Sequence, residues 1–416
     1  MQEASRYAVG LDIGTTTVRC VVGHVDGPGQ APTIIGVAAE AGKGLRKGNV
    51  VTLNDVAQAA DKALETAERL SGHRIEAATV SINGTHIVGL KSTGVIAVGA
   101  VDHEINLSDL ARVEEAATVV QLPANREILD VTPINYKLDN QSGIKDPLGM
   151  TGVRLEVDAY MITALGPHLK NLEKAITLSD TQPRQIVVAG LAAAKTALND
   201  QQKENGVALV DIGGTTTNVV VYEEGDLLHL GVVPYGSVNI TNDLAIGLKT
   251  DLAVAERVKL EHSVASADFR KDSKKTVTVK LDGHTHEFDT ETIDEIVEAR
   301  LEEIFEEVNK ELKKAGRQAK LPGGVVLSGG GAKLTGVADY AKAVLKLNAR
   351  VAEAPELSGV ADKVTTPDFA TALGLMMIDL DAAPAVARTN GSETNAGRLL
   401  SGSMKAAGNL FKKLRS

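Results

Sequence analysis

The sequence predicts an α/β protein with two related lobes, an α+β insertion and a basic C-terminal tail. Three observations support this fold class. Apolar, β-branched runs alternate with segments of helical periodicity along most of the chain. One glycine-rich loop occurs twice, near Asp12 and near Asp211, about half a chain apart. A chain of 416 residues is also too long for one ordinary core and suits two or three domains.

The first lobe is expected to open with two paired strands, because apolar, β-branched runs flank Gly14. A helix follows at 53–70, where apolar residues recur at spacings of three and four, and Asn54 suits its N-cap. The run at 79–82 predicts a short strand, and the Asn83-Gly84 pair after it predicts a hairpin turn.

The stretch 84–163 predicts a compact α+β insertion inside the first lobe. One helix is expected at 108–120, with Ser108 as its N-cap. Short apolar runs predict strands around 87–90, 94–98, 127–138 and 153–163.

Further elements follow the insertion, and a second lobe begins with them. The strand pair at 207–222 repeats the opening strand pair, which is why two related lobes are expected. The Asp282-Gly283 pair marks a hairpin turn. In order, the elements are helix 167–178, strand 184–189, helix 191–198, strands 207–212 and 216–222, helix 251–262, hairpin 276–288, helix 291–314, strand 323–328, and helices 336–347 and 369–380.

Composition excludes several classes of protein. The 44 basic and 54 acidic side chains give a net charge of −10, which argues against a general nucleic-acid binder. Aromatic residues make up 3% of the chain, too few for base-stacking platforms. Cys20 is the single cysteine, so a disulfide framework and a cysteine-based zinc site are excluded. No stretch approaches the roughly 20 apolar residues that span a bilayer, and the polar start predicts no signal peptide.

Each copy of the repeated loop joins two strands through a tight glycine turn. Such a turn points backbone N–H groups into one concavity, threonine hydroxyls add donors, and the arrangement binds phosphate. The aspartate at each strand end can hold Mg²⁺ through water. We therefore expect two facing loops that clamp a polyphosphate. The candidate residues are Asp12, Gly14, Thr15 and Thr16 in the first copy and Asp211, Gly213, Gly214, Thr215 and Thr216 in the second.

A third glycine cluster supports a nucleotide site. Gly329, Gly330 and Gly331 lie between a predicted strand and a predicted helix, a junction that places a helix N-terminus against a ligand. One Asp-x-Gly loop alone would be an ordinary hairpin turn, and the glycine cluster alone is a weak signal. The three elements in series indicate nucleotide binding.

This ordered set of loops resembles the actin, Hsp70 and sugar-kinase superfamily, and within it the FtsA family of bacterial actin-like cell-division proteins. The resemblance implies a two-lobed actin-like ATPase fold. It covers about residues 7–380 and the extreme C-terminus, and its most specific element is the insertion inside the first lobe. The shared motifs are GLRKG at 44–48, GMTGVR at 149–154, AGLA at 189–192, VPYG at 233–236 and AERVKLEH at 255–262.

The resemblance also implies a division into subdomains and further nucleotide contacts. Gly236, Glu256 and Lys259 would line the nucleotide, which the resemblance identifies as ATP with Mg²⁺. From the residues alone, Glu256 and Lys259 are an ordinary i,i+3 surface pair. The implied parts are 1A at 1–83 and 164–205, 1C at 84–163, 2A at 206–242 and 322–381, 2B at 243–321, a flexible linker at 382–397 and an amphipathic membrane-targeting helix at 398–416.

The segment between the two phosphate loops lacks the expected base. Relatives that transfer phosphate well place a Glu, Gln or Asp there to orient the attacking group. The matching stretch here, 188–193, reads VAGLAA and carries no polar side chain. We therefore expect ATP to be bound and hydrolysed at most slowly, with no catalytic residue assigned.

The tail, RLLSGSMKAAGNLFKKLRS, is basic on an acidic protein. Taken as a helix, it places Met404, Leu410, Phe411 and Leu414 on one face, with Lys412, Lys413 and Arg415 around it. A basic amphipathic helix lies in the membrane interface and favours anionic lipid. A disordered tail and a helix that docks on a partner are the alternatives. The resemblance to the FtsA membrane-targeting helix favours the membrane.

The function that the resemblance implies is that of an ATP-binding adaptor. It would polymerise on the cytoplasmic face of the membrane at the division site and anchor the ring of the tubulin-like protein FtsZ. Subdomain 2B would receive the FtsZ C-terminal peptide, with Arg300 at that contact, and 1C would bind other division proteins. The alternatives are a small-metabolite kinase of the same superfamily and a membrane-assembly ATPase of the pilus type.

Overall fold

The computed structural model describes residues 6–27, 30–99, 102–270 and 275–382. These residues form two compact units. The first unit consists of the described residues up to Thr85 together with Lys170–Leu380. The second unit is built on His86–Leu169. Among the described residues, no helix is both long and apolar enough to cross a bilayer.

The first unit contains two sheets of related topology. One consists of β1 (Arg6–Ile13), β2 (Thr17–Val25), β3 (Thr33–Ala41), β6 (Ala77–Ile82), β11 (Gln182–Val188) and β19 (Ser358–Gly359). The other consists of β12 (Val207–Ile212), β13 (Thr217–Glu223), β14 (Asp226–Val233), β17 (Val325–Ser328) and β18 (Ala349–Val351). Their orders are β11-β6-β1-β2-β3-β19 and β14-β13-β12-β17-β18. In each, the first strand is antiparallel to the second and parallel to a later one, which confirms the predicted repeat.

Helices and small elements complete the first unit. They are β4 (Leu45–Arg46), β5 (Asn49–Val50), α1 (Leu53–Ser71), α3 (Gly166–Thr177), which leads in from the second unit, α4 (Ala189–Ala197), α5 (Asp200–Asn205), α6 (Ser237–Gly247), α7 (Leu252–His262), η1 (Ala267–Phe269), β15 (Thr276–Leu281), β16 (His284–Asp289), α8 (Thr290–Lys314), η2 (Gly330–Lys333), α9 (Val337–Leu345), η3 (Ala361–Val364), η4 (Pro367–Phe369) and α10 (Ala370–Asp381). The helices predicted near 53–70, 251–262 and 291–314 are confirmed.

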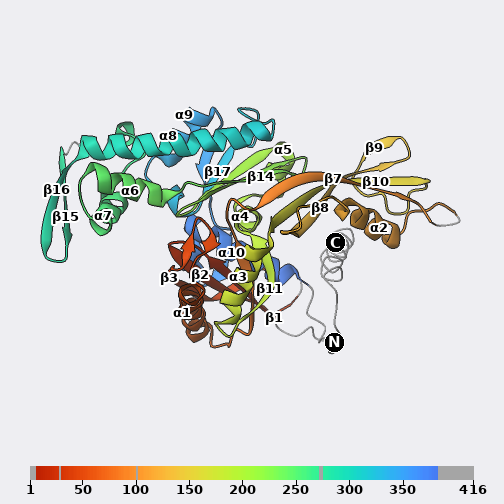
Figure 1. Cartoon of the computed structure of the whole chain (residues 1–416), viewed down its shortest axis with the longest axis horizontal. Coiled ribbons are helices and arrows are strands. Elements are labelled where there is room, and N and C mark those ends of the chain that lie inside the picture. The colour runs from red at the N-terminus through yellow and green to blue at the C-terminus, as the bar shows by residue number, and fades with distance from the viewer. Residues whose placement is uncertain (1–5, 28–29, 100–101, 271–274, 383–416) are drawn as a thin grey trace. The chain divides into compact units, whose positions relative to one another are not determined.

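The long helix α8 shows how the apolar pattern determines an element. The side chain of Asp289, the N-cap residue of α8, accepts a hydrogen bond from the Thr292 N–H at 2.9 Å. In Figure 1, α6 lies beside α8, α7 packs on α6, and the β15–β16 hairpin stands at the N-terminal end of α8. Its buried stripe packs into the core around the second sheet and consists of Ile293, Val297, Leu301, Phe305, Val308 and Leu312.

Three local predictions were wrong. Asn83-Gly84 is no hairpin turn, because β6 pairs in parallel with β1 and β11. The N-cap of α1 is Thr52 rather than Asn54. The N-cap of α2 (Leu107–Thr118) is Asn106 rather than Ser108, and the Asn106 side chain accepts hydrogen bonds from the N–H groups of Ser108 and Asp109. Sequence reasoning also missed β3 and β14, the third strands of their sheets.

The second unit is the predicted α+β structure. Its strands are β7 (Val88–Ala97), β8 (Arg126–Leu138), β9 (Gln141–Ile144) and β10 (Arg154–Leu165), paired antiparallel in the order β7-β10-β8-β9. Helix α2 packs on this sheet. The core between them consists of Val98, Ile105, Val113, Ala117, Tyr136, Leu138, Ile144, Leu155, Val157 and Ala159.

A buried carboxylate, Asp379 of α10, joins three strands of the first sheet to that helix. It accepts hydrogen bonds from the Val9 N–H of β1 at 3.0 Å and from the Thr79 hydroxyl of β6 at 2.7 Å. It also pairs with Arg184 of β11. The Asp379 side chain is fully buried, so the loss of its carboxylate would leave these donors without a partner.

We expect Asp379→Ala to lower the free energy of unfolding by about 3 kcal/mol, because a buried ion pair would be broken from one side. That corresponds to a fall of about 5 °C in the thermal midpoint of a unit this large. Thermal unfolding measures this, with Asp61→Ala on the exposed face of α1 as a matched control. An unchanged midpoint for Asp379→Ala would contradict the assignment.

Candidate functional site

The two copies of the repeated loop face each other in the first unit. The first joins β1 to β2, and the second joins β12 to β13. The hydroxyl oxygens of Thr15 and Thr215 lie 3.0 Å apart. A Cβ built on Gly214 would lie 2.8 Å from Cγ2 of Thr16. The structure therefore brings together the residues that the sequence placed half a chain apart.

Glycine is required at the start of each turn by a close backbone approach. A Cβ on Gly14 would lie 2.4 Å from the Thr17 carbonyl oxygen, and one on Gly213 would lie 2.9 Å from the Thr216 carbonyl oxygen. Both distances are shorter than a real Cβ contact. The same tight turn is thus built twice, as the sequence repeat predicts.

Each aspartate is held by a serine on the neighbouring parallel strand. Leu11 pairs with Val80, so Asp12 lies level with Ser81, and its Oδ1 accepts from the Ser81 hydroxyl at 2.8 Å. Asp211 pairs with Ser328, whose hydroxyl donates to the Asp211 Oδ1 at 3.1 Å. Sequence reasoning missed both serines, although each is a polar residue near the end of an apolar strand.

Burial dominates the electrostatics of the two aspartates. Burial raises the pKa of Asp12 to about 6, although Arg19 and the Ser81 hydrogen bond act to lower it, and Asp211 adds to the increase. Burial also raises the pKa of Asp211, against hydrogen bonds from Asn218 and Ser328. Asn218 Nδ2 donates to the Asp211 Oδ2 at 3.0 Å. Two carboxyl groups that raise each other's energy in this way favour a bound cation.

The glycine cluster at Gly329–Gly331 is connected to β2, the strand after the first aspartate loop, through Pro367 and Asp368. The Gly329 N–H donates to the Pro367 carbonyl at 3.0 Å. The neighbouring Asp368 carboxylate accepts from Arg19 of β2 at 2.7 Å and lies 3.6 Å from Lys333 Nζ. Burial would raise the pKa of Asp368, but these cations hold it below its usual value.

Open space adjoins the middle of this cluster. A Cβ on Gly330 would meet nothing within 4 Å, whereas one on Gly331 would lie 2.3 Å from Ile212. The cluster therefore combines one face packed against β12 with one face that a ligand can approach.

Gly236 lies directly against the second loop. A Cβ there would lie 2.6 Å from the Gly213 carbonyl oxygen. The N–H groups of Ser237 and Val238, at the start of α6, donate to the carbonyls of Gly213 and Gly214 at 2.9 and 2.7 Å. The N-terminus of α6 thereby fixes the carbonyl side of the loop.

Glu256 and Lys259 connect α7 to α6. Lys259 Nζ donates to Glu256 Oε2 at 2.7 Å, the expected i,i+3 contact, and to the Thr241 hydroxyl at 2.9 Å. The Lys259 side chain is only 10% exposed, so this is more than a surface pair. Both residues therefore support the helix that holds the second loop.

Arg300 lies elsewhere, between α8 and α6. Its Nε and Nη2 donate to the Asp243 carboxylate at 2.5 and 3.0 Å, and its Nη1 donates to Glu303 at 2.6 Å. The guanidinium carbon is 5.8 Å from the Tyr235 ring centroid. These donors are engaged within the chain, and the structure does not bring Arg300 to the loops.

The start of α4 contributes no acid to the site. A Cβ on Gly190 would lie 2.9 Å from the Cβ of Asn218, so α4 passes beside the residue that holds Asp211. The buried side chains of α4 here are alanines. A polar residue that sequence reasoning missed, Asn83, reaches the second loop instead: its Nδ2 donates to the Thr216 hydroxyl at 3.1 Å.

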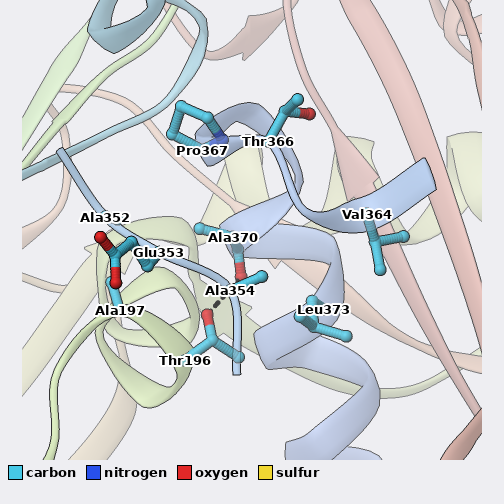
Figure 2. A pocket seen from close by; sticks show the side chains of 10 residues that line it. All are labelled: Thr196, Ala197, Ala352, Glu353, Ala354, Val364, Thr366, Pro367, Ala370 and Leu373. Carbon is cyan, nitrogen blue, oxygen red and sulfur yellow. Dashed lines mark hydrogen bonds between the residues drawn. The ribbon is translucent and has the colours of Figure 1, made fainter. Parts of the chain in front are cut away.

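A separate small pocket lies beside α4 and α10. Figure 2 shows its lining, together with the hydrogen bond of 2.9 Å from the Thr196 hydroxyl to the Ala370 carbonyl. None of the sequence-predicted site residues lines it. The lining residues are Thr196, Ala197, Ala352, Glu353, Ala354, Val364, Thr366, Pro367, Ala370 and Leu373.

The predicted membrane-binding residues lie outside the described residues. They are Met404, Leu410, Phe411, Lys412, Lys413, Leu414 and Arg415. The linker predicted at 382–397 also lies outside them except for its first residue.

Family models match two parts of the chain. A model described as "Cell division protein FtsA" matches residues 208–374. A model described as "SHS2 domain inserted in FTSA" matches residues 84–163. The second match identifies the α+β insertion as an SHS2 domain.

Solved structures confirm the fold at low sequence identity. The PilM–PilN type IV pilus biogenesis complex aligns with a TM-score of 0.66 and 18% identity, over 91% of this chain and 99% of that chain. MreB5 of Spiroplasma citri, solved bound to ADP, aligns with a TM-score of 0.52 and 12% identity, over 90% and 95%. These similarities establish an actin-like α/β fold.

Curated relatives share much more of the sequence. Cell division protein FtsA of Pseudomonas aeruginosa is 35% identical over 380 residues, 91% of this chain and 90% of the relative. The FtsA of Bacillus subtilis is 39% identical over 369 residues, 88% and 82% of the two chains. That of Escherichia coli K12 is 31% identical over 379 residues, 89% and 90%. With this identity over nearly its whole length, the chain belongs to the FtsA family of cell division proteins.

Proposed function

We propose that the chain binds ATP with Mg²⁺ between its two aspartate loops and uses the nucleotide as a structural switch in cell division. The observation that carries this is the pair of carboxyl groups with raised pKa, the half-buried Asp12 and the buried Asp211, on loops that touch through Thr15 and Thr215. The actin-like fold and the ADP-bound neighbour support a nucleotide at this position.

The residues present fit such a ligand. Asp12 and Asp211 supply oxygens suited to Mg²⁺ and its waters, and the glycine and threonine loops supply donors for phosphate. The open face at Gly330 suits the nucleoside. Gly236, Glu256 and Lys259 hold the second loop in place through α6. When bound, Mg²⁺ would neutralise the phosphate charge that the acidic site cannot accept by itself.

The subdomain boundaries implied by the sequence form part of the proposal. We assign 1A to 1–83 and 164–205, 1C to 84–163, 2A to 206–242 and 322–381, and 2B to 243–321. In this scheme 2B receives the FtsZ C-terminal peptide, 1C receives other division proteins, and the chain polymerises with itself. Arg300 would support the 2B surface that receives this peptide, because its two hydrogen bonds to Asp243 hold α8 on α6.

We expect Asp12→Asn and Asp211→Asn each to weaken Mg²⁺-dependent ATP binding by tenfold or more, because the amide keeps the shape but not the charge. Calorimetric titration with ATP, with and without Mg²⁺, measures the change. Each substitution removes a poorly hydrated negative charge, so we expect the free energy of unfolding not to fall. A loss of ATP affinity can then be distinguished from a loss of folding. Asp61→Asn on α1 is the control. Wild-type affinity in both loop variants would refute the site.

We expect ATP turnover at least about 100-fold below the median enzyme value of about 10 s⁻¹, because no acid lies at the start of α4. Phosphate release under saturating Mg-ATP measures it, with a set of small metabolites as acceptors. Turnover near the median with any acceptor would favour the metabolite-kinase alternative.

The tail carries the proposed membrane attachment. Its basic and apolar residues, all beyond position 397, have the composition of an interfacial helix. We expect the full chain to co-sediment with anionic liposomes in Mg-ATP and a truncation after Asn395 to stay in solution. Liposomes of neutral lipid are the control, since the attraction is partly electrostatic. Equal sedimentation of the two chains would exclude the tail as the anchor.

A further inference from the structure

Asn83 occupies a position that the internal repeat makes informative. It lies two residues beyond Ser81, the serine that holds Asp12. In the second sheet, the residue two beyond the matching Ser328 is Gly330. Asn83 after β6 and Gly330 after β17 therefore occupy equivalent positions. The first carries an amide side chain, whereas the second has no side chain and adjoins open space.

The Asn83 side chain is fixed in one orientation. Its Oδ1 accepts from the Gly84 N–H at 2.8 Å, so the Nδ2 is the end that reaches the Thr216 hydroxyl at 3.1 Å. Its backbone is held as well. A Cβ on Gly48 would lie 2.6 Å from the Asn83 carbonyl oxygen, so the β4–β5 turn packs directly on it.

That contact joins the two halves of the first unit. Asn83 follows β6 of the first sheet, whereas Thr216 ends the loop before β13 of the second sheet. Thr216 is 3% exposed and Asn83 is half-buried, so the hydrogen bond is partly shielded from water. Ser81 lies in β6 and Asn83 directly follows it, and each donates a hydrogen bond to a residue of one of the two aspartate-bearing segments.

We propose that Asn83 is a positioning residue that clasps the two loops together and slows the release of bound nucleotide. This rests on the proposed nucleotide site. In this proposal a nucleotide gripped by both loops is released when the loops separate, and separation breaks the hydrogen bond from Asn83 to Thr216. This proposal also assigns a role to the GLRKG segment at 44–48, because Gly48 packs against the backbone of Asn83 and holds it in position.

The test is the rate at which a fluorescent ATP analogue, bound with Mg²⁺, is displaced by excess ATP. We expect Asn83→Ala to release it about threefold to tenfold faster than the wild type, the effect of one lost hydrogen bond. Asn205→Ala, at the exposed end of α5, is the matched control and should release at the wild-type rate. Thermal unfolding of each variant separates faster release from partial unfolding.

A second variant identifies the partner. In a Thr216→Val background, Asn83→Ala should change the release rate less than twofold, because the acceptor hydroxyl is already gone. Wild-type release in Asn83→Ala would overturn the inference, and so would an equal acceleration in both backgrounds. Absence of nucleotide binding in the wild type would instead overturn the proposed function itself.

Discussion

The structure depends on two carboxyl groups that interact electrostatically, the half-buried Asp12 near the end of β1 and the buried Asp211 near the end of β12. Burial of like charges is costly, and the fold offsets this cost with a serine from each neighbouring parallel strand and with Asn218. Arg19 lowers the pKa of both groups while it pairs with Asp368. The result is a site with excess negative charge on the protein side, which a divalent cation can balance.

The surrounding elements serve to hold the loops still. The N-terminus of α6 fixes the second loop, α7 fixes α6 through Lys259, and Asp379 ties α10 to the first sheet. Such an arrangement suits the binding of a nucleotide more than its hydrolysis, because the residues of α4 near Asp211 include alanines and no general base. Under the proposed function, a nucleotide that is bound and hydrolysed slowly would fit a structural role in this family of cell division proteins.

Sequence reasoning recovered the features that repeat or have a clear period. The duplicated loop predicted two related halves, and the apolar stripe of α8 predicted its length to within one residue. It failed where the partner is distant in sequence. Asn83-Gly84 carries a strong local turn signal, yet β6 pairs with β1 and β11, and Asn83 contacts Thr216. Ser81 and Ser328 gave no periodic signal, because their role depends on strand register, which only the fold determines.

The most direct test of the central claim is hydrogen–deuterium exchange with and without Mg-ATP. Simultaneous protection of the backbone amides in 12–17, 211–217 and 329–332 is the result that a clamp built from both loops and the glycine cluster requires. Protection of one loop alone, or of none of the three segments, would contradict it. Either result would mean that the facing aspartates serve the fold rather than a nucleotide.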